Sequence, residues 1–313
     1  MSINDFVKTK LKQPNIHSYD YNNFYKRQML YKLEEIKKKD MTYILGARCC
    51  DGVVLVSDTK VTIDNGADFA YTKKLFKPFN SVVMGAAGIS GLYASFQDRM
   101  NLAVSNDEDQ GINVSNVGTM SVIAENVIRN MHDTYKEDRW LITQNFNVIM
   151  GMRMGLEAEL KCFNGLGTPE PTDLRKPKVI GHGEPYGAMF IKELWNEDWT
   201  MERTARLALF VIKIIRDKEI DSSVGYIDEC LPQVYYIPDI VVSNIQTSNA
   251  ILKDKLDRSA KLTNKELDET NRLIAEQFPI KELEKKEVKH LIDEISSANA
   301  HLDTFFKSGE FKI

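Results

Sequence analysis

Residues 41–62 read MTYILGARCCDGVVLVSDTKVT. Two short apolar runs, TYILGARCC and GVVLVSD, are separated by Asp51 and Gly52. An Asp-Gly pair between two strand-like runs is a strong hairpin signal, because both residues tolerate the left-handed backbone that a tight turn needs. This stretch therefore predicts a β-hairpin whose first strand begins at Thr42.

The segments downstream of the hairpin predict an ordered series of strands and helices. The apolar run SVVMGAAG ends in small residues and predicts another strand. Apolar residues at helical spacing predict two amphipathic helices, then a second hairpin, a long helix with Thr200 as its N-cap, and closing strands. These segments are, in order, 89–106, 117–136, 146–167, 199–217 and 224–242.

This order predicts an α+β fold: a four-layer αββα sandwich, in which two antiparallel sheets are flanked by helices. We expect the sandwich to span residues 42–245. The polar, Lys-rich segment 1–41 is expected to be a propeptide, a leading helix or an over-extended start. Segment 246–313 is Lys- and Glu-rich and predicts a helical C-terminal extension, which is either a solvated appendage or a helix for partner binding or assembly.

Composition excludes several classes of protein. The 313 residues carry a net charge of −4, so no basic surplus draws the chain to nucleic acid or an anionic membrane. The four cysteines form no Cys-x-x-Cys pair, so zinc and redox motifs are absent and we expect a reduced, cytoplasmic setting. We expect no metal and no cofactor. The polar N-terminal segment has no apolar core, so we expect no signal peptide, and no apolar stretch is long enough to span a bilayer.

The hairpin and the residues after it resemble the catalytic β-type subunits of the proteasome family, which are N-terminal-nucleophile hydrolases. That family has a Thr at the start of the first strand, an Asp sixteen residues on, a Lys thirty-two on and a Gly forty-six on. At these offsets this sequence has Thr42, Asp58, Lys74 and Gly88. The resemblance extends over residues 42–245.

The resemblance implies a role for each of these four residues. Thr42 is the nucleophile, and its own free α-amino group is the base that takes the hydroxyl proton. Lys74 favours the neutral amine and the alkoxide, because its charge repels one and attracts the other. Asp58 holds that Lys, and the N–H of Gly88 donates to the oxyanion of the tetrahedral intermediate.

Three positions depart from the family pattern. Met41 precedes Thr42 where the family has a Gly, so the mechanism requires removal of everything before Thr42, and removal of an initiator Met41 would also expose it. A family Gly-Ser-Gly is replaced by Gly-His-Gly, which makes His182 a candidate supporting residue.

The third departure follows the long helix, where the family has Asp-x-x-Ser-Gly-Gly. An ungapped count places Glu219 and Ser222 there as supporting residues. A shifted register offers instead Asp217, or Asp221 with Ser223.

The resemblance implies a threonine-type endopeptidase that works in intracellular protein degradation. Its partners are then other proteasome-type subunits in a ring assembly, and its substrate is unfolded polypeptide. The alternative is a noncatalytic ring or assembly subunit of the same fold, in which upstream chain keeps Thr42 capped. A weaker alternative is another amidohydrolase on the same sandwich, since a fold does not set the substrate.

Overall fold

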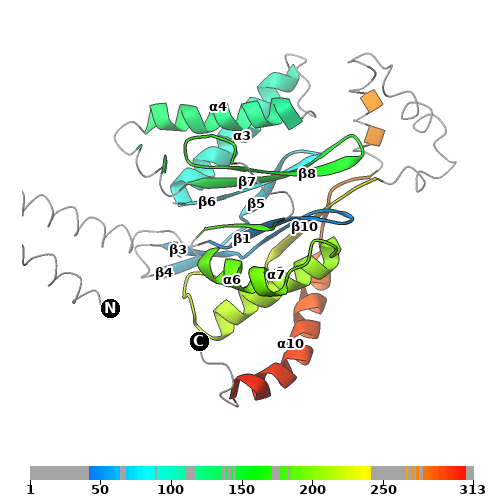
Figure 1. Cartoon of the computed structure of the whole chain (residues 1–313). Helices are drawn as coiled ribbons and strands as arrows, with labels where there is room; N and C mark the ends of the chain where they lie inside the picture. The colour runs from blue at the N-terminus through cyan, green and yellow to red at the C-terminus, as the bar shows by residue number, and fades with distance from the viewer. Residues whose placement is uncertain are drawn as a thin grey trace, which may run out of the picture. The chain divides into compact units, whose positions relative to one another are not determined.

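The structure is a computed structural model of the chain, shown in Figure 1. The segment 1–41 and most of the segment 246–277 lie outside the described residues, and the predictions made for them stay predictions. The described residues are 42–63, 68–88, 90–109, 117–135, 139, 142–143, 146–170, 176–181, 184–240, 266, 269–270, 273–274 and 278–307.

The predicted N-terminal hairpin lies at the centre of a five-stranded antiparallel sheet. Gly52 begins the second strand with φ +149°, and a Cβ there would lie 2.3 Å from the carbonyl oxygen of Ile237, so the turn needs glycine. The strand order is β11-β10-β2-β1-β9. Their bounds are β1 Ile44–Cys49, β2 Gly52–Ser57, β9 Lys178–Ile180, β10 Gln233–Pro238 and β11 Lys281–Glu282.

A second, four-stranded antiparallel sheet has the order β5-β6-β7-β8 and contains the second predicted hairpin, β7–β8. A short hairpin, β3–β4, precedes β5 in the chain. The bounds are β3 Lys60–Ile63, β4 Asp68–Tyr71, β5 Leu75–Phe79, β6 Val82–Ala87, β7 Asn147–Met154 and β8 Glu157–Phe163.

Helices cover the outer face of each sheet, so the fold has four layers (Figure 1). Side chains of α3 and α4 pack with the four-stranded sheet around Phe96 and Phe146. Side chains of α6, α7 and α10 pack on the five-stranded sheet around Leu45 and Val56. The bounds are α3 Ser90–Asp109, α4 Val117–Thr134, α6 Glu184–Leu194, α7 Met201–Asp217 and α10 Lys285–Lys307.

A third apolar cluster, which includes Ile44, Leu55, Ile149 and Leu160, fills the space between the two sheets. The alternation of side chains along each strand sends one set to this inner cluster and the other set to the helices. The predicted αββα sandwich is therefore confirmed. The side chain of Thr200 accepts a hydrogen bond from the N–H of Arg203, so the predicted N-cap of α7 is also present.

The end of the chain contributes to the sandwich itself. Strand β11 pairs with the edge of β10, where Glu282 lies opposite Tyr235. Helix α10 buries Val288 and Leu291 in the same apolar cluster as α7. Part of the segment predicted as an extension thus supplies an edge strand and a covering helix.

Candidate active site

Thr42 lies two residues before the start of β1, and 6% of its surface is exposed. The next residue, Tyr43, ties this point to the end of β2, because its N–H donates to Oδ1 of Asp58 at 2.9 Å and its carbonyl accepts from the N–H of Asp58 at 3.0 Å. Gly181, with φ +98°, lies against the carbonyl of Thr42, and a Cβ there would stand 2.1 Å from that oxygen. Local packing thus fixes the backbone of Thr42 from two sides.

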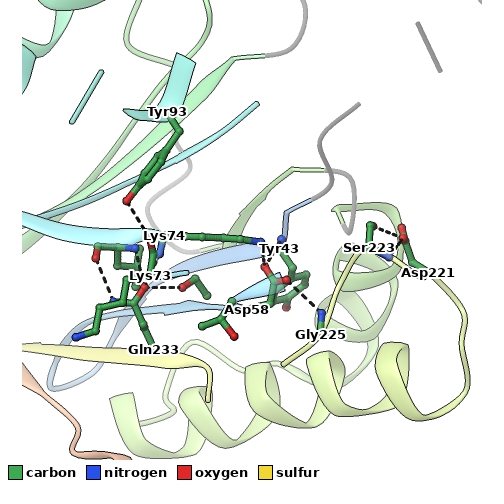
Figure 2. Close-up of polar contacts among 12 residues, drawn as sticks. Tyr43, Asp58, Lys73, Lys74, Tyr93, Asp221, Ser223, Gly225 and Gln233 are labelled. Atoms are coloured by element: carbon green, nitrogen blue, oxygen red, sulfur yellow. Dashed lines mark hydrogen bonds and ion pairs between the residues drawn. The ribbon is translucent and has the colours of Figure 1, made fainter. Parts of the chain in front are cut away.

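Asp58 and Lys74 form a buried ion pair beside Thr42. Nζ of Lys74 lies 2.6 Å from Oδ1 of Asp58, and the two side chains are 4% and 0% exposed. The pair joins the end of β2 to the residue before β5, and so connects the two sheets (Figure 2). The structure therefore brings together two residues that the sequence places sixteen positions apart.

The Asp58 carboxylate has further donors besides Lys74. Its Oδ2 accepts the N–H of Gly225 at 3.2 Å, while the N–H of Tyr43 reaches Oδ1. Burial raises the pKa of Asp58, and the charge and hydrogen bond of Lys74 and the two backbone donors oppose that rise. A carboxylate with several donors in a dry site is held in one orientation, because each lost contact would leave a buried charge unpaired.

Gly88 follows β6 with φ +147°, in the left-handed region that favours glycine. It lines a pocket of about 380 Å³ together with Thr42 and Lys74. Tyr93 and Gln97 of α3 form part of another wall. The residues that carry the candidate nucleophile, ammonium and oxyanion donor therefore line one pocket, to which β3, β6 and α3 also contribute side chains.

The loop after α7 contains the residues that the sequence offers as supporting site residues. Glu219 and Ser222 are exposed, and Glu219 has φ +51° in the turn that ends the helix. Asp221 and Ser223 are buried, and Oδ1 of Asp221 accepts hydrogen bonds from both the N–H and the hydroxyl of Ser223.

Burial and the mutual contact favour the shifted register, Asp221 with Ser223, as the candidate supporting pair. Two residues after Ser223 comes Gly225, the donor to Asp58, so the loop is anchored to the buried ion pair (Figure 2). Asp217 stays at the end of α7, where it pairs with Lys213 and Arg216. His182 lies outside the described residues.

The sequence does not predict two residues near the ion pair, Gln233 and Lys60. Gln233, at the start of β10, accepts hydrogen bonds from the N–H groups of Lys74 and Leu75. Burial lowers the pKa of Lys60, and the carboxylates of Asp58 and Asp221 oppose that shift. In the sequence, Gln233 is a polar residue at the start of the apolar run QVYYIP. Many strands begin in this way, so the sequence does not single Gln233 out.

The arrangement can support nucleophilic attack on a carbonyl at Thr42. A hydroxyl next to a buried, paired ammonium and a left-handed Gly combines a nucleophile, a fixed charge and a backbone donor. Among the described residues, no cluster of three or more His, Cys, Asp or Glu could hold a metal ion. Within the same part of the chain, the helices are too short or too polar to cross a membrane.

Comparisons with known proteins identify the family and the fold of the chain. A family model described as "Proteasome subunit" matches residues 40–227. A search of curated proteins returned no match.

Solved structures with a similar fold include a (Gly-1) mutant of Anbu from Hyphomicrobium sp. strain MC1, at 17% identity and a TM-score of 0.51. Another is Anbu, described as an ancestral beta-subunit, from Yersinia bercovieri, at 16% identity and a TM-score of 0.50. Each comparison covers 71% of this chain and 98% of the other chain. At these identities the likeness shows a shared fold.

Proposed function

Because the chain belongs to the proteasome subunit family, we propose that it is a threonine-type endopeptidase subunit with Thr42 as its N-terminal nucleophile. The observation that carries this proposal is the meeting of Thr42, Lys74 and Gly88 at one pocket, with Asp58 buried behind Lys74. The offsets between these residues in the sequence are those of catalytic β-type subunits.

In this proposal, removal of the residues before Thr42 frees its α-amino group. The amine takes the proton of the Thr42 hydroxyl while the oxygen attacks the substrate carbonyl. An unperturbed α-amine has a pKa of about 7.7–8.0, so part of it is neutral at physiological pH. The cation of Lys74 then favours the neutral amine further.

The N–H of Gly88 stabilises the oxyanion, and loss of one such donor costs on the order of 100- to 1,000-fold in rate. The leaving amine takes the proton from the α-ammonium, which leaves an ester on Thr42. Water hydrolyses this ester and regenerates the free hydroxyl. Asp221 and Ser223 are proposed to replace the family's Asp-x-x-Ser pair, in place of Glu219 and Ser222.

The substrate is proposed to be unfolded polypeptide, and the partners other proteasome-type subunits in a ring. A cytoplasmic setting is part of the proposal and is supported by the four cysteines, each of which is a free thiol. The competing function is that of a noncatalytic ring or assembly subunit. The observation that favours it is Met41 with the upstream segment 1–41, which would cap the amine if retained.

The decisive experiment determines the N-terminal residue of the purified protein by mass spectrometry and treats the same sample with an epoxyketone probe. We expect a mature chain that begins at Thr42 and one adduct on that residue. Thr42→Ala should carry no adduct, whereas the matched control Thr59→Ala should keep it, since Thr59 is a buried threonine whose hydroxyl donates to the carbonyl of Cys230. A mature chain that keeps Met41, and stays unlabelled, would establish the noncatalytic function.

A further inference from the structure

The backbone that carries Lys74 is held by a side chain from the other sheet. Oε1 of Gln233 accepts the N–H of Lys74 at 2.6 Å and the N–H of Leu75 at 2.8 Å. Nε2 of Gln233 donates to the carbonyl of Leu75 at 3.1 Å. One amide side chain thus binds three backbone groups at the start of β5, as a neighbouring strand would.

Gln233 is 5% exposed, so these contacts form in a dry environment where they are hard to replace with water. The residue before Lys74 is also held. The hydroxyl of Tyr93 donates to the carbonyl of Lys73 at 3.2 Å (Figure 2). Residues 73–75 are therefore fixed on both sides, and the position of the Lys74 ammonium depends on how well this short segment is held.

Glu282 of the last strand, β11, completes this support. Its Oε1 pairs with Nζ of Lys73 at 2.8 Å near the surface, where the two side chains are 39% and 68% exposed. Burial alone would raise the pKa of Glu282, but hydrogen bonds from Lys73, Tyr235 and Gln233, with the charge of Lys73, hold that pKa below its ordinary value. Glu282 therefore lies between Lys73, with which it pairs, and Gln233, whose amide holds the backbone of Lys74.

We propose that Gln233 and Glu282 are positioning residues that keep Lys74 at Asp58, so that the C-terminal strand β11 controls the reactivity of Thr42. This inference rests on the proposed function. Rates of this kind depend steeply on geometry, and a misplacement of about 1 Å can cost on the order of 100-fold. A displaced Lys74 would also let the α-amine of Thr42 return toward its ordinary pKa.

The test compares Glu282→Gln with Glu284→Gln in the full chain. Glu284 is the matched control, because it lies two residues further along the same segment and pairs only at the surface with Lys286, where the two side chains are 66% and 80% exposed. The readouts are the rate of Thr42 labelling by a β-lactone probe as a function of pH, and amide hydrogen exchange of the peptide 72–76.

We expect Glu282→Gln to lower the labelling rate about 3- to 10-fold near pH 7 and to move the acidic limb of the profile to higher pH. It should also speed exchange at Lys74 and Leu75 while the melting temperature stays near that of Glu284→Gln. Gln233→Leu should give the larger loss, about 10- to 100-fold. If Gln233→Leu fails to fold, the Glu282→Gln comparison alone decides.

Labelling, pH profile and exchange equal to those of Glu284→Gln would overturn the inference. A wild-type chain that is never labelled at Thr42 would instead contradict the proposed function. Exchange would still decide the structural part in that case, because faster exchange in Glu282→Gln supports the hold on Lys74 and unchanged exchange refutes it.

Discussion

Nζ of Lys74 and Oδ1 of Asp58 are 2.6 Å apart, and water is excluded from both side chains. Such a pair is weak evidence for stability in itself, because desolvation of two charges offsets most of their attraction. Removal of one residue of the pair is strongly destabilising, because the other residue is left buried without its counter-charge. The two residues therefore stabilise the native state only together.

We expect Asp58→Asn to lower the free energy of unfolding by about 3–5 kcal/mol, because it leaves the Lys74 ammonium without its counter-charge. Urea denaturation would measure this change. Asp98→Asn, on the exposed face of α3, is the control and should stay within about 0.5 kcal/mol. A double variant, Asp58→Leu with Lys74→Met, should lose less than Asp58→Asn alone, and a larger loss would contradict this account.

Gly181→Ala should displace Thr42. The new Cβ would stand 2.1 Å from the carbonyl oxygen of Thr42, and the backbone at φ +98° disfavours any other residue. We expect a loss of at least about 1–2 kcal/mol of stability and a fall in probe labelling. Gly91→Ala is the matched control, because a Cβ there meets nothing within 4 Å and helix α3 favours alanine by about 0.5–1 kcal/mol. Equal stability of the two variants would be incompatible with this packing.

Arg153→Met should stabilise the protein. Arg153 is 3% exposed, and among the described residues neither Nη atom has a hydrogen-bond partner. Burial lowers the pKa of its guanidinium to about 10. An apolar side chain of similar length removes this cost, so we expect a gain of about 1–3 kcal/mol in calorimetry. The exposed Arg129→Met is the control, and a destabilised Arg153→Met would contradict this account.

Thiol reactivity should separate the cysteines by burial. Cys50 is exposed, whereas burial raises the pKa of Cys49 and of Cys162 to about 12. At about pH 8, iodoacetamide should modify Cys50 in the native protein and the two buried thiols only on unfolding. Peptide mass spectrometry measures this, with Cys50→Ser as the control. Early modification of Cys162 would argue against the inner apolar cluster.

The same two thiols make stability depend on pH. Unfolded thiols ionise near a pKa of about 8.5, whereas the native ones keep their protons to about pH 12. The native state therefore binds more protons in this window, and stability falls as pH rises above about 8.5.

Local features of the fold are predictable from the sequence. The Asp-Gly turn predicts β1–β2, and apolar spacing predicts α3, α4 and the N-cap of α7 at Thr200. Those signals act over a few residues. The pairing of β10 with β2 joins residues far apart in the chain, and no local pattern in either strand specifies that partner.

The candidate site is likewise predictable from the sequence only in part. The resemblance to the proteasome family predicts Asp58 and Lys74 as site residues, and the structure pairs them. The loop after α7 lacks the family's double Gly, so the sequence leaves its register open, and burial favours Asp221 with Ser223 over Glu219 with Ser222. Strand β11 is two charged residues long, and a Lys-Glu pair carries no strand signal.

The strand order of the five-stranded sheet also determines when each strand can find its partner during synthesis. The central strands β1 and β2 leave the ribosome first, but their outer neighbours β9 and β10 begin at residues 178 and 233. At about 5–20 residues per second, the free edge of β2 waits on the order of 10–30 s for β10. A nascent hairpin with two open edges invites pairing with other chains during that interval. We therefore expect the growing chain to depend on chaperones until β10, at the start of the last quarter of the chain, is made.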